Sequence, residues 1–344
     1  MPNNHIIIRA DGSKNIGMGH LSRSILLSRF LQKKYNYDVI LITKFNEKSS
    51  LFLENKKIHF LNIENTISIN NELLFLKNYI LKFKTKLLIL DVLENDVNYE
   101  FTDYLRSTGV KLLSITDDSY KRIINSDVII NANPCQKNGY YYSEVGKYYL
   151  GPSYFIMDES YSNSLPIKLK NKNKIIISLG GSDHNNLIFT LLDSINEIDD
   201  EFFVKIISSK STGYQKKISS IINNFNFKIE LKFDVDGIYN EWKGFDFAIT
   251  AGGNTLFERI AFKLPGLTIC QLERQNEIAN KFQEVDLNYN LGLGVELDKE
   301  IIKQKIIFFS ENLHLYSKNI NQSNLIDGNG LSRVSNIIYN LIKN

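Results

Sequence analysis

The residue types and spacing best suited to chemistry lie in the stretch IIIRADGSKNIGMGHLSRS, residues 6–24. Gly17 and Gly19 would let a ligand approach the backbone closely, because neither carries a side chain. The loop then delivers His20 into the first turn of an expected helix, with Arg23 one turn further along the same face. The positive helix end and the arginine both disfavour imidazolium, so we expect a neutral imidazole that accepts a proton from water or a hydroxyl.

Two other interpretations of this loop follow from its residues. A histidine at the start of a helix can also serve only to pack or to hydrogen-bond, and the sequence leaves this alternative open. The stretch GMGHLS also begins like the dinucleotide fingerprint GxGxxG, but Ser22 stands where the third glycine belongs. A dinucleotide site further needs an acidic residue near the end of the second strand, where this chain has Lys44. We therefore do not expect NAD or FAD.

Two further glycine-rich turns are typical of anion binding. Each combines a buried strand, a glycine pair and a helix, so that backbone N–H groups at the helix start would face a phosphate. The first turn is SLGGSDHNN, with candidate phosphate ligands Gly180, Gly181 and Ser182. The second is TAGGNTLFE, with candidates Gly252, Gly253, Asn254 and Thr255. Asp183, in the first turn, is expected only to cap the helix that follows.

Side chains near these turns indicate what would accompany the phosphates. Glu258 would lie one turn into the second of these helices, where its carboxylate could accept from the two adjacent hydroxyls of a ribose. The segment QLERQNEIAN follows the next strand and would point Arg274, Gln275 and Asn276 at a bound ligand. Two anion sites in one half of the chain, with a sugar contact beside them, predict a nucleotide-sugar as the ligand.

These loops require a scaffold of alternating strands and helices, and the chain has that pattern from end to end. Strands are expected over β-branched-rich apolar runs: 5–11, 38–43, 86–92, 110–116, 127–132, 174–180, 203–208, 227–233, 245–250 and 264–270. Helices are expected where apolar residues recur every three or four positions: 20–34, 71–83, 185–197, 214–224, 254–262, 275–285 and a final amphipathic segment, GLSRVSNIIYNLIK.

The polar stretch DESYSNSLPIKLKNKN interrupts this alternation and predicts a linker over 158–173. It divides the chain into an N-terminal Rossmann-like domain (1–157), a C-terminal nucleotide-binding domain (174–328) and a closing helix (329–344). The expected fold class is therefore α/β, with two doubly wound sheets that face each other across a cleft. Because ligands of such sheets bind beyond the carboxyl ends of the strands, the glycine-rich turns should line that cleft.

Composition argues against several classes of function. The chain has 344 residues, of which 43% are apolar and 23% are charged, as in ordinary globular proteins. A net charge of +3 without a basic cluster argues against a nucleic-acid partner. No basic leader and no run of about 18 apolar residues occurs, so we expect a cytoplasmic protein without stable membrane insertion. Cys135 and Cys270 lack metal-ligand spacing and are expected to be reduced thiols.

The motif around His20 resembles the signature of the PseG/SpsG-type UDP-sugar hydrolases of pseudaminic acid biosynthesis. That signature runs R-x-D-x-S/G-x-x-I-G-x-G-H with an arginine three residues later, and the matching residues are Arg9, Asp11, Ile16, Gly17, Gly19, His20 and Arg23. The turn ISLGGSDHNN is similar to a Gly-Gly-Ser-Asp loop of the family. AGGNTLFERIAFKLP and ERQNEIAN resemble the donor-binding segments of these hydrolases and of related GT-B transferases. The likeness runs from about residue 6 to 295.

The resemblance implies a GT-B fold and the inverting hydrolysis of a UDP-linked 2,4-diacetamido-2,4,6-trideoxyhexose to free sugar and UDP. It implies no metal and no cofactor, a nucleotide-sugar as the small-molecule partner, and His20 as the general base that activates water. The substrate contacts that we assign on this basis are Arg9, Asp11, Gly17, Gly19, Arg23, Asp91, Gln275 and Asn276. Main-chain groups near Ile238 would bind the uracil, the glycine-rich turns the phosphates, and Glu258 the ribose.

The chain departs from the family pattern on the sugar side. After the fourth strand the family often has Asp-His-Tyr, whereas this chain has Asp91-Val92-Leu93 and lacks the tyrosine hydroxyl. Ser24 stands where the hydrolases often carry aspartate, and Asp158 stands where they carry arginine. Two alternatives therefore stay open. One is a GT-B glycosyltransferase with a sugar or lipid hydroxyl as acceptor, and the other is a nucleotide-sugar-binding protein without catalysis.

Overall fold

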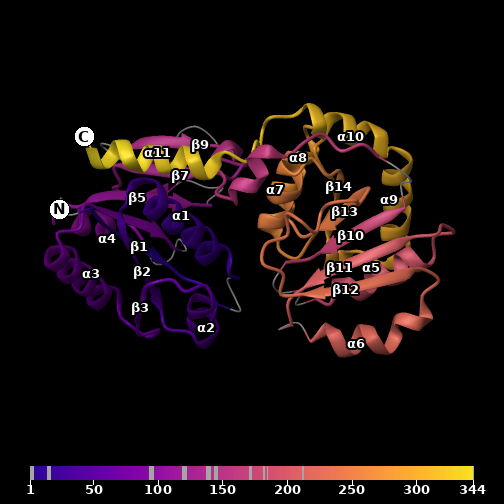
Figure 1. The fold of residues 1–344 in the computed structure, drawn as a ribbon, viewed down its shortest axis with the longest axis horizontal. Coiled ribbons are helices and arrows are strands. Elements are labelled where there is room, and N and C mark those ends of the chain that lie inside the picture. Colours follow the sequence, from indigo (N-terminus) through magenta and orange to yellow (C-terminus); the bar gives the residue numbers. More distant parts are fainter. Residues whose placement is uncertain are drawn as a thin grey trace. The chain divides into compact units, whose positions relative to one another are not determined.

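The chain forms two compact units, each with its own parallel sheet and apolar core (Figure 1). Unit 1 consists of Met1–Glu159 together with Gly328–Asn344, and unit 2 of Ser160–Asp327. The computed structural model describes residues 4–13, 17–92, 97–117, 122–136, 141–142, 146–169, 173–180, 183, 185–210 and 213–343.

Unit 1 is built on seven parallel strands in the order β3-β2-β1-β4-β5-β7-β9. Their bounds are β1 His5–Ala10, β2 Asp38–Lys44, β3 Phe60–Ile63, β4 Leu87–Asp91, β5 Lys111–Thr116, β7 Val128–Asn131 and β9 Lys147–Leu150. A separate short parallel pair is formed by β6 (Arg122–Ile123) and β8 (Tyr141–Tyr142). The first four strands in chain order run 3-2-1-4 across the sheet, as in Rossmann domains, so β1 and β4 are neighbours.

Helices cover both faces of the unit 1 sheet. They are α1 (Gly19–Tyr35), α2 (Glu47–Asn55), α3 (Ile69–Phe83), α4 (Tyr99–Arg106) and α11 (Gly330–Lys343). On β1, Ile6 and Ile8 belong to one core cluster with residues of α1 and α11, whereas Ile7 belongs to another with residues of α3 and α4. Because successive side chains of a strand point to opposite faces, both sets must be apolar, which explains the continuous apolar run.

Helix α11 belongs to unit 1 although the whole of unit 2 precedes it in the chain. It packs against α1 and the short 3-10 helix η2 (Pro152–Tyr154) (Figure 1). Gly330 begins α11, and a β-carbon there would lie 2.0 Å from the Phe155 carbonyl oxygen, so a larger residue would displace the backbone. Leu331 and Ile338 bury one face of the helix, which is the amphipathic helix expected from the sequence.

Unit 2 has six parallel strands in the order β12-β11-β10-β13-β14-β15. The strands are β10 Lys174–Ser178, β11 Phe203–Ser208, β12 Lys228–Phe233, β13 Phe247–Thr250, β14 Gly266–Cys270 and β15 Tyr289–Leu293. The helices are α5 Leu187–Asn196, α6 Tyr214–Ile221, α7 Asn254–Ala261, α8 Glu273–Gln283, α9 Lys299–Glu311 and α10 Leu313–Gln322, with 3-10 turns at Glu159–Asn163 (η3), Ile222–Asn224 (η5) and Gly294–Glu296 (η6). This is the 3-2-1-4-5-6 order of a Rossmann domain, so β10 and β13 are neighbours.

The expected strands and helices are all present, with bounds within about three residues of those predicted. Strands β3, β9 and β15, which have only four or five residues, were not predicted. Helices α4, α9 and α10 were not predicted either. The polar stretch expected to be a linker over 158–173 instead begins with η3. Its Tyr161 is 3% exposed and accepts a hydrogen bond from Trp242 Nε1 at 3.3 Å, so this part of the stretch is packed within unit 2.

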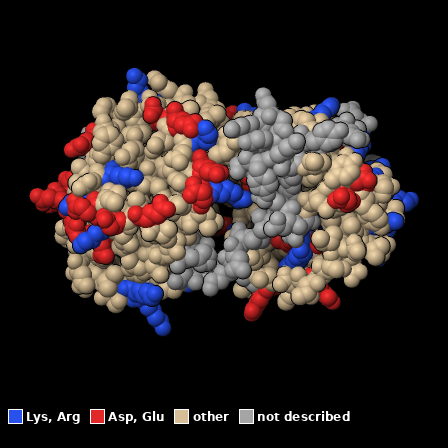
Figure 2. All heavy atoms as spheres, turned by 180° about the vertical axis from the view of Figure 1, so that it is seen from behind, with Lys and Arg blue, Asp and Glu red and all other residues tan. Residues whose placement is uncertain are grey.

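Charged side chains of both signs are interspersed on the face shown in Figure 2. The described residues on that face form no extended basic surface, in keeping with the even spread of lysine and arginine along the chain. Within the described part of the chain, every helix falls short of the length or the apolar character that crossing a bilayer would require.

Candidate active site

The candidate catalytic residues lie at the point where the strand order of unit 1 reverses. His20 follows β1 through the glycine loop, and Asp91 is the last residue of the neighbouring strand β4. Ala10 and Asp91 are paired in the register of these two strands. In doubly wound sheets, ligands bind beyond the carboxyl ends of the strands at such a reversal, so the fold itself brings these two residues to a binding position.

Two backbone features are described for the loop before His20. Gly17 has a φ of +77°, and its carbonyl oxygen accepts a hydrogen bond from Ser13 N–H at 3.1 Å. Gly19 begins α1, and His20 is therefore the second residue of the helix, in the predicted first turn. Ile16 of the matching motif lies outside the described residues.

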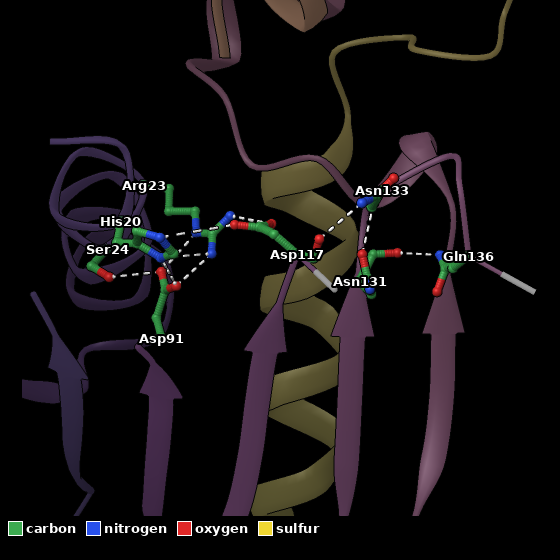
Figure 3. A network of polar contacts seen from close by, with 8 residues as sticks. All are labelled: His20, Arg23, Ser24, Asp91, Asp117, Asn131, Asn133 and Gln136. Carbon is green, nitrogen blue, oxygen red and sulfur yellow. Dashed lines mark hydrogen bonds and ion pairs between the residues drawn. The ribbon is translucent and has the colours of Figure 1, made fainter. Parts of the chain in front are cut away.

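His20 is oriented by a buried carboxylate. Its Nδ1 lies 2.7 Å from Asp91 Oδ1, and Asp91 is fully buried (Figure 3). Burial alone would raise the pKa of Asp91, but Arg23 and His20 more than offset it, so that pKa lies below its usual value. An ionised carboxylate only accepts, so Nδ1–H donates to Asp91 and Nε2 is the ring atom that can take a proton. The sequence argument considered the helix end and Arg23 and did not foresee this carboxylate.

Arg23 joins two carboxylates with one guanidinium. Its Nε and Nη2 donate to the Oδ2 and Oδ1 atoms of Asp91 at 2.7 and 2.5 Å, and its Nη1 donates to Asp117 Oδ1 at 2.8 Å (Figure 3). Nη2 also lies 3.0 Å from His20 Nδ1, but both atoms are donors to the same Asp91 oxygen. Burial would lower the pKa of Arg23, but Asp117 and Asp91 raise it overall. Arg23 holds the two carboxylates in place, and its expected contact with substrate stays a prediction.

Asp91 also differs from the expectation that it contacts substrate. Its side chain is inaccessible, and both oxygens accept from protein groups, including the Ser24 hydroxyl at 3.3 Å. Its position indicates a role behind His20, where it sets the tautomer and favours the imidazolium that forms when Nε2 is protonated. Ser24, which the sequence marked only as a departure from the family, is therefore part of the support for Asp91.

Arg9 and Asp11 form a second ion cluster beside this one. Arg9 is fully buried, with Nε donating to Glu72 Oε1 at 2.7 Å and Nη1 lying 2.6 Å from Asp11 Oδ1. Burial would raise the pKa of Asp11, but Arg9 and the Lys44 N–H lower it. Arg9 was expected to touch substrate, but it has no accessible surface and instead holds Asp11 at the carboxyl end of β1. Asp11, with 13% of its side chain exposed, is the accessible member of the pair.

Asp117 is a site residue that the sequence analysis missed. It follows β5, with its side chain 26% exposed, and its Oδ2 lies 4.0 Å from His20 Nε2. A network at the end of β7 holds its backbone, because Asn133 Nδ2 donates to the Asp117 carbonyl at 2.8 Å and Asn133 N–H donates to Asn131 Oδ1 at 2.7 Å (Figure 3). Gln136 Nε2 extends the network to the Asn131 carbonyl. The sequence feature that could have indicated Asp117 is its position as a polar residue directly after a buried strand.

The first glycine-rich turn of unit 2 lies at the corresponding reversal, after β10. Gly180 has a φ of +82°, while Gly181 and Ser182 lie outside the described residues. Asp183 caps α5 as predicted: its two oxygens accept from the N–H groups of Leu187 and Ile188, both at 3.0 Å. Tyr214 O–H also donates to Asp183 Oδ2 at 2.6 Å.

The second glycine-rich turn follows β13 and leads directly into α7. A β-carbon on Gly252 would lie 2.8 Å from both the Cβ and the carbonyl oxygen of Gln275, so the turn and the start of α8 pack too closely for a side chain. A β-carbon on Gly253 would meet nothing closer than 4.0 Å. Asn254 and Thr255 are the first residues of α7, which places their N–H groups at the helix end that attracts anions.

The other predicted ligand contacts of unit 2 are Glu258, Ile238, Gln275 and Asn276, and their roles stay predictions. Glu258 lies about one turn into α7 and is half-buried. Gln275 and Asn276 were expected to face a ligand, but Gln275 Oε1 accepts from Gln271 N–H at 3.0 Å and Asn276 Oδ1 accepts from Asn290 Nδ2 at 2.7 Å. Ile238 is buried, and its carbonyl accepts from Glu241 N–H at 2.9 Å.

Neither the cysteines nor the acidic clusters make a metal site in the described part of the chain. Cys135 and Cys270 are free thiols. Among the described residues, no three histidine, cysteine, aspartate or glutamate side chains gather in a way that could hold a metal ion. Asp91 and Asp117 instead both form ion pairs with the guanidinium of Arg23.

Searches with the sequence found relatives but no matching family model. The chain is 29% identical to the spore coat polysaccharide biosynthesis protein SpsG of Bacillus subtilis, over 98% of each chain. It is 26% identical to the UDP-2,4-diacetamido-2,4,6-trideoxy-beta-L-altropyranose hydrolase of Campylobacter jejuni, over 83% of this chain and 99% of that one. It is 28% identical to the uncharacterized protein MJ1062 of Methanocaldococcus jannaschii over 79% of its own length, and it spans only 57% of that protein.

Comparison with solved structures identifies the architecture. The fold matches that of MurG from Acinetobacter baumannii with a TM-score of 0.71 at 12% identity, over 98% of this chain and 99% of that one. It matches CalG4, the calicheamicin glycosyltransferase, with a TM-score of 0.68 at 9% identity, over 100% and 99%. At such identities the likeness establishes the fold alone, which is GT-B. By its sequence relatives and its fold, the chain is therefore a GT-B protein related to the PseG/SpsG type.

Proposed function

We propose that this protein is an enzyme that hydrolyses a UDP-linked 2,4-diacetamido-2,4,6-trideoxyhexose to free sugar and UDP, with inversion at the anomeric carbon. The observation that carries the proposal is the contact of 2.7 Å between His20 Nδ1 and the buried, ionised Asp91. A carboxylate in this place fixes one tautomer of the ring and leaves Nε2 as a base. The name of the Campylobacter jejuni relative, a hydrolase of a UDP-sugar of this class, supports the choice of substrate.

In the proposed reaction His20 is the general base. The oxygen of a water forms a bond to the anomeric carbon while the bond from that carbon to the β-phosphate oxygen breaks, and its electron pair leaves with UDP. His20 Nε2 takes a proton from the water, and Asp91 stabilises the imidazolium by its charge and its hydrogen bond. The imidazolium then releases the proton to solvent. A base positioned in this way contributes about 10²–10⁴-fold to the rate.

In the same proposal unit 2 binds the nucleotide. The N–H groups after Gly253, at the start of α7, would bind the diphosphate, and Gly180 would allow close approach after β10. Gly181 and Ser182 remain predicted phosphate ligands, and Glu258 the predicted ribose ligand. Stabilising the charge that develops on the diphosphate makes UDP a better leaving group, which is the main contribution expected from these N–H groups.

The test is release of UDP in the absence of any acceptor. Purified protein is incubated with UDP-2,4-diacetamido-2,4,6-trideoxy-β-L-altropyranose alone, UDP is quantified, and the anomer first formed is identified by NMR. We expect UDP and the inverted free sugar from wild type, and a loss of about 100-fold or more in His20→Asn at unchanged UDP affinity. His59→Asn, at an exposed position of unit 1, is the matched control.

Two results would contradict the proposal. UDP release that requires an added sugar or lipid hydroxyl would indicate a glycosyltransferase instead. Tight UDP binding without turnover of any UDP-sugar would indicate a binding protein. Wild-type turnover in His20→Asn would leave hydrolysis standing but remove His20 as its base.

A further inference from the structure

We infer that a small, mostly apolar cavity of unit 1 is a subsite for the methyl group of the acetamido substituent at C2 of the sugar. This inference rests on the proposed function and deepens it, because it names the part of that substrate that the cavity would take. The cavity lies at the carboxyl ends of β5 and β7, next to the charged residues of the candidate active site.

The fold forms this cavity on the face of the sheet that α1 and α11 cover. Ile115 of β5 and Ile130 of β7 belong to the same core cluster as residues of these helices, and Ile156 joins them from the segment after η2. Buried apolar side chains form most of the wall, those of Ile115, Ile130, Ala132, Phe155 and Ile156. They leave a volume of ≈ 10 Å³, which is room for one small group such as a water molecule or a methyl.

The wall favours an apolar occupant at a polar opening. Aliphatic and aromatic side chains offer no hydrogen bond, so a hydroxyl pressed against them loses its water partners without replacement, whereas a methyl group gains packing contacts. The remaining lining residues are Arg23, Thr116, Asp117 and Tyr154. Asp117, with 26% of its side chain exposed, marks where the cavity opens. The cavity therefore combines apolar walls with a charged opening.

An acetamido group has the same two-part character. Its methyl end is apolar, whereas the amide that links it to the sugar ring has an N–H donor and a carbonyl acceptor. With the methyl in the cavity, the amide would lie at the charged opening, where polar groups can be hydrated or paired. The methyl at C6 of a 6-deoxy sugar has no such polar linker, since it is bonded directly to a ring carbon.

The distance to His20 selects the acetamido group at C2 over the one at C4. At the opening, Asp117 Oδ2 lies 4.0 Å from His20 Nε2, the atom that would deprotonate the attacking water. That water attacks C1, the anomeric carbon, so Nε2 would lie on the C1 side of the bound sugar. C2 is bonded to C1, whereas C4 is on the opposite side of the six-membered ring. The substituent at C2 is therefore the one within reach of the cavity.

The experiment compares the binding of three ligands and does not depend on turnover. The first is UDP-2,4-diacetamido-2,4,6-trideoxy-β-L-altropyranose. The other two carry a formamido group in place of the acetamido group, at C2 or at C4, and so lack one methyl each. Affinities are measured by isothermal titration calorimetry on the full chain with His20→Asn, which is expected to bind these ligands without hydrolysing them.

We expect the C2 formamido analogue to bind at least about fivefold more weakly than the diacetamido ligand, because it leaves the cavity without its methyl group. The C4 formamido analogue should bind within about twofold of the diacetamido ligand, because its missing methyl lies elsewhere.

A second substitution, made in the same His20→Asn background, tests whether the cavity is the cause. Ala132→Val fills the cavity from its wall, so the diacetamido ligand should bind at least about fivefold more weakly and the C2 formamido analogue less than about threefold more weakly. The preference for acetamido at C2 is then lost. Ala261→Val, which enlarges a buried alanine of α7 in unit 2, is the control and should keep that preference. Each pair of affinities is measured on one preparation, so partial unfolding of a variant does not alter their ratio.

The outcomes separate the subsite from the proposed function. A C2 preference that Ala132→Val removes supports the subsite even if wild type releases no UDP, in which case the proposed hydrolysis alone fails. Equal binding of the diacetamido ligand and the C2 analogue overturns the subsite, whether or not wild type hydrolyses the substrate. Weaker binding of the C4 analogue alone overturns the assignment to C2. A preference that persists unchanged in Ala132→Val overturns the assignment to this cavity.

Discussion

The two units have the same strand order around their central pair, yet they place different chemistry at the point where that order reverses. In unit 1, the reversal between β1 and β4 holds a histidine, an arginine and two carboxylates, which are linked to one another by hydrogen bonds. In unit 2, the reversal between β10 and β13 holds glycine-rich turns and the start of α7. One topology therefore offers side-chain acid–base groups in one unit and backbone donors in the other.

Buried arginines show the same contrast. Arg9 and Arg23 of unit 1 pair with carboxylates, which fix their positions and in turn are fixed by them. Among the described residues, Arg259 of unit 2 donates to neutral oxygens, those of the Leu264 carbonyl and the Asn288 side chain, and burial lowers its pKa to about 9. The buried arginines of unit 1 therefore orient the candidate site, whereas Arg259 lies within the packing of α7.

The largest expected effect comes from Asp91→Asn, which would break the unit 1 side of this contrast. The amide cannot accept from both His20 Nδ1 and the Arg23 fork, so the ring loses its fixed tautomer and a buried guanidinium loses a counter-charge. We expect kcat to fall at least about 100-fold and the free energy of unfolding to fall by about 3–5 kcal/mol. Steady-state UDP release and urea unfolding measure the two effects. Unchanged kcat would remove Asp91 from the mechanism.

A smaller effect is expected in unit 2 from Gly252→Ala. The new methyl group would lie 2.8 Å from backbone and side-chain atoms of Gln275, so we expect a loss of about 1–3 kcal/mol in unfolding free energy, measured in urea. Gly253→Ala is the matched control, since its β-carbon meets nothing within 4 Å except the end of the Gln275 side chain. Equal stability of the two variants would refute the close packing of the turn.

The Gly253→Ala variant also sharpens the comparison. It should fold like wild type and still bind UDP more weakly, because a methyl group at the start of α7 hinders approach of the diphosphate. Isothermal titration calorimetry with UDP measures this change. Wild-type affinity would indicate that the diphosphate does not approach this turn.

The next effect concerns the cap of α5. Asp183→Ala would release the N–H groups of Leu187 and Ile188 and the Tyr214 hydroxyl, so we expect a loss of about 1–2 kcal/mol in unfolding free energy. Asp193→Ala, at an exposed position of the same helix, should change stability little. A chemical unfolding experiment on both variants measures the difference, and the cap is contradicted if they behave alike.

The smallest expected effect is a change in how the stability of the fold depends on pH. Arg23 and His20 hold the pKa of Asp91 in the folded protein below its usual value, although burial opposes this shift. At pH values above the pKa that Asp91 has in the unfolded chain, the ionised carboxylate therefore stabilises the fold. The contribution should be lost as pH falls below about 4. Between pH 6 and pH 2, the midpoint temperature of thermal unfolding should therefore fall less steeply for Asp91→Asn than for wild type. Parallel curves would show that Asp91 does not supply this dependence.

The sequence was sufficient for most of the central strands and for the motif around His20, because these depend on local pattern. Apolar runs with β-branched residues predicted the strands, and Gly17 and Gly19 predicted the loop. Asp183 was predicted as a cap because side chains of this type satisfy helix N–H groups a few residues away.

The partners of His20 could not be predicted in the same way. Asp91 lies at least 67 residues, and Asp117 at least 94 residues, along the chain from the residues they bind in α1, and only the order of the strands brings them together. Arg9 was misassigned because an arginine in a motif has the same letter whether it faces a ligand or a buried glutamate. Tyr161 was missed because its polar neighbours hide a single buried aromatic residue.

The return of α11 to unit 1 bears on the order in which the chain can fold during synthesis. Unit 2 is one continuous segment, whereas the apolar surface formed by Ile6, Ile25 and their neighbours is covered only when Leu331 and Ile338 have emerged from the ribosome. A nascent chain should thus complete unit 2 first and leave the core of unit 1 unfinished until α11 has been synthesised. Truncation a few residues before Gly330 would leave that surface open and favour aggregation.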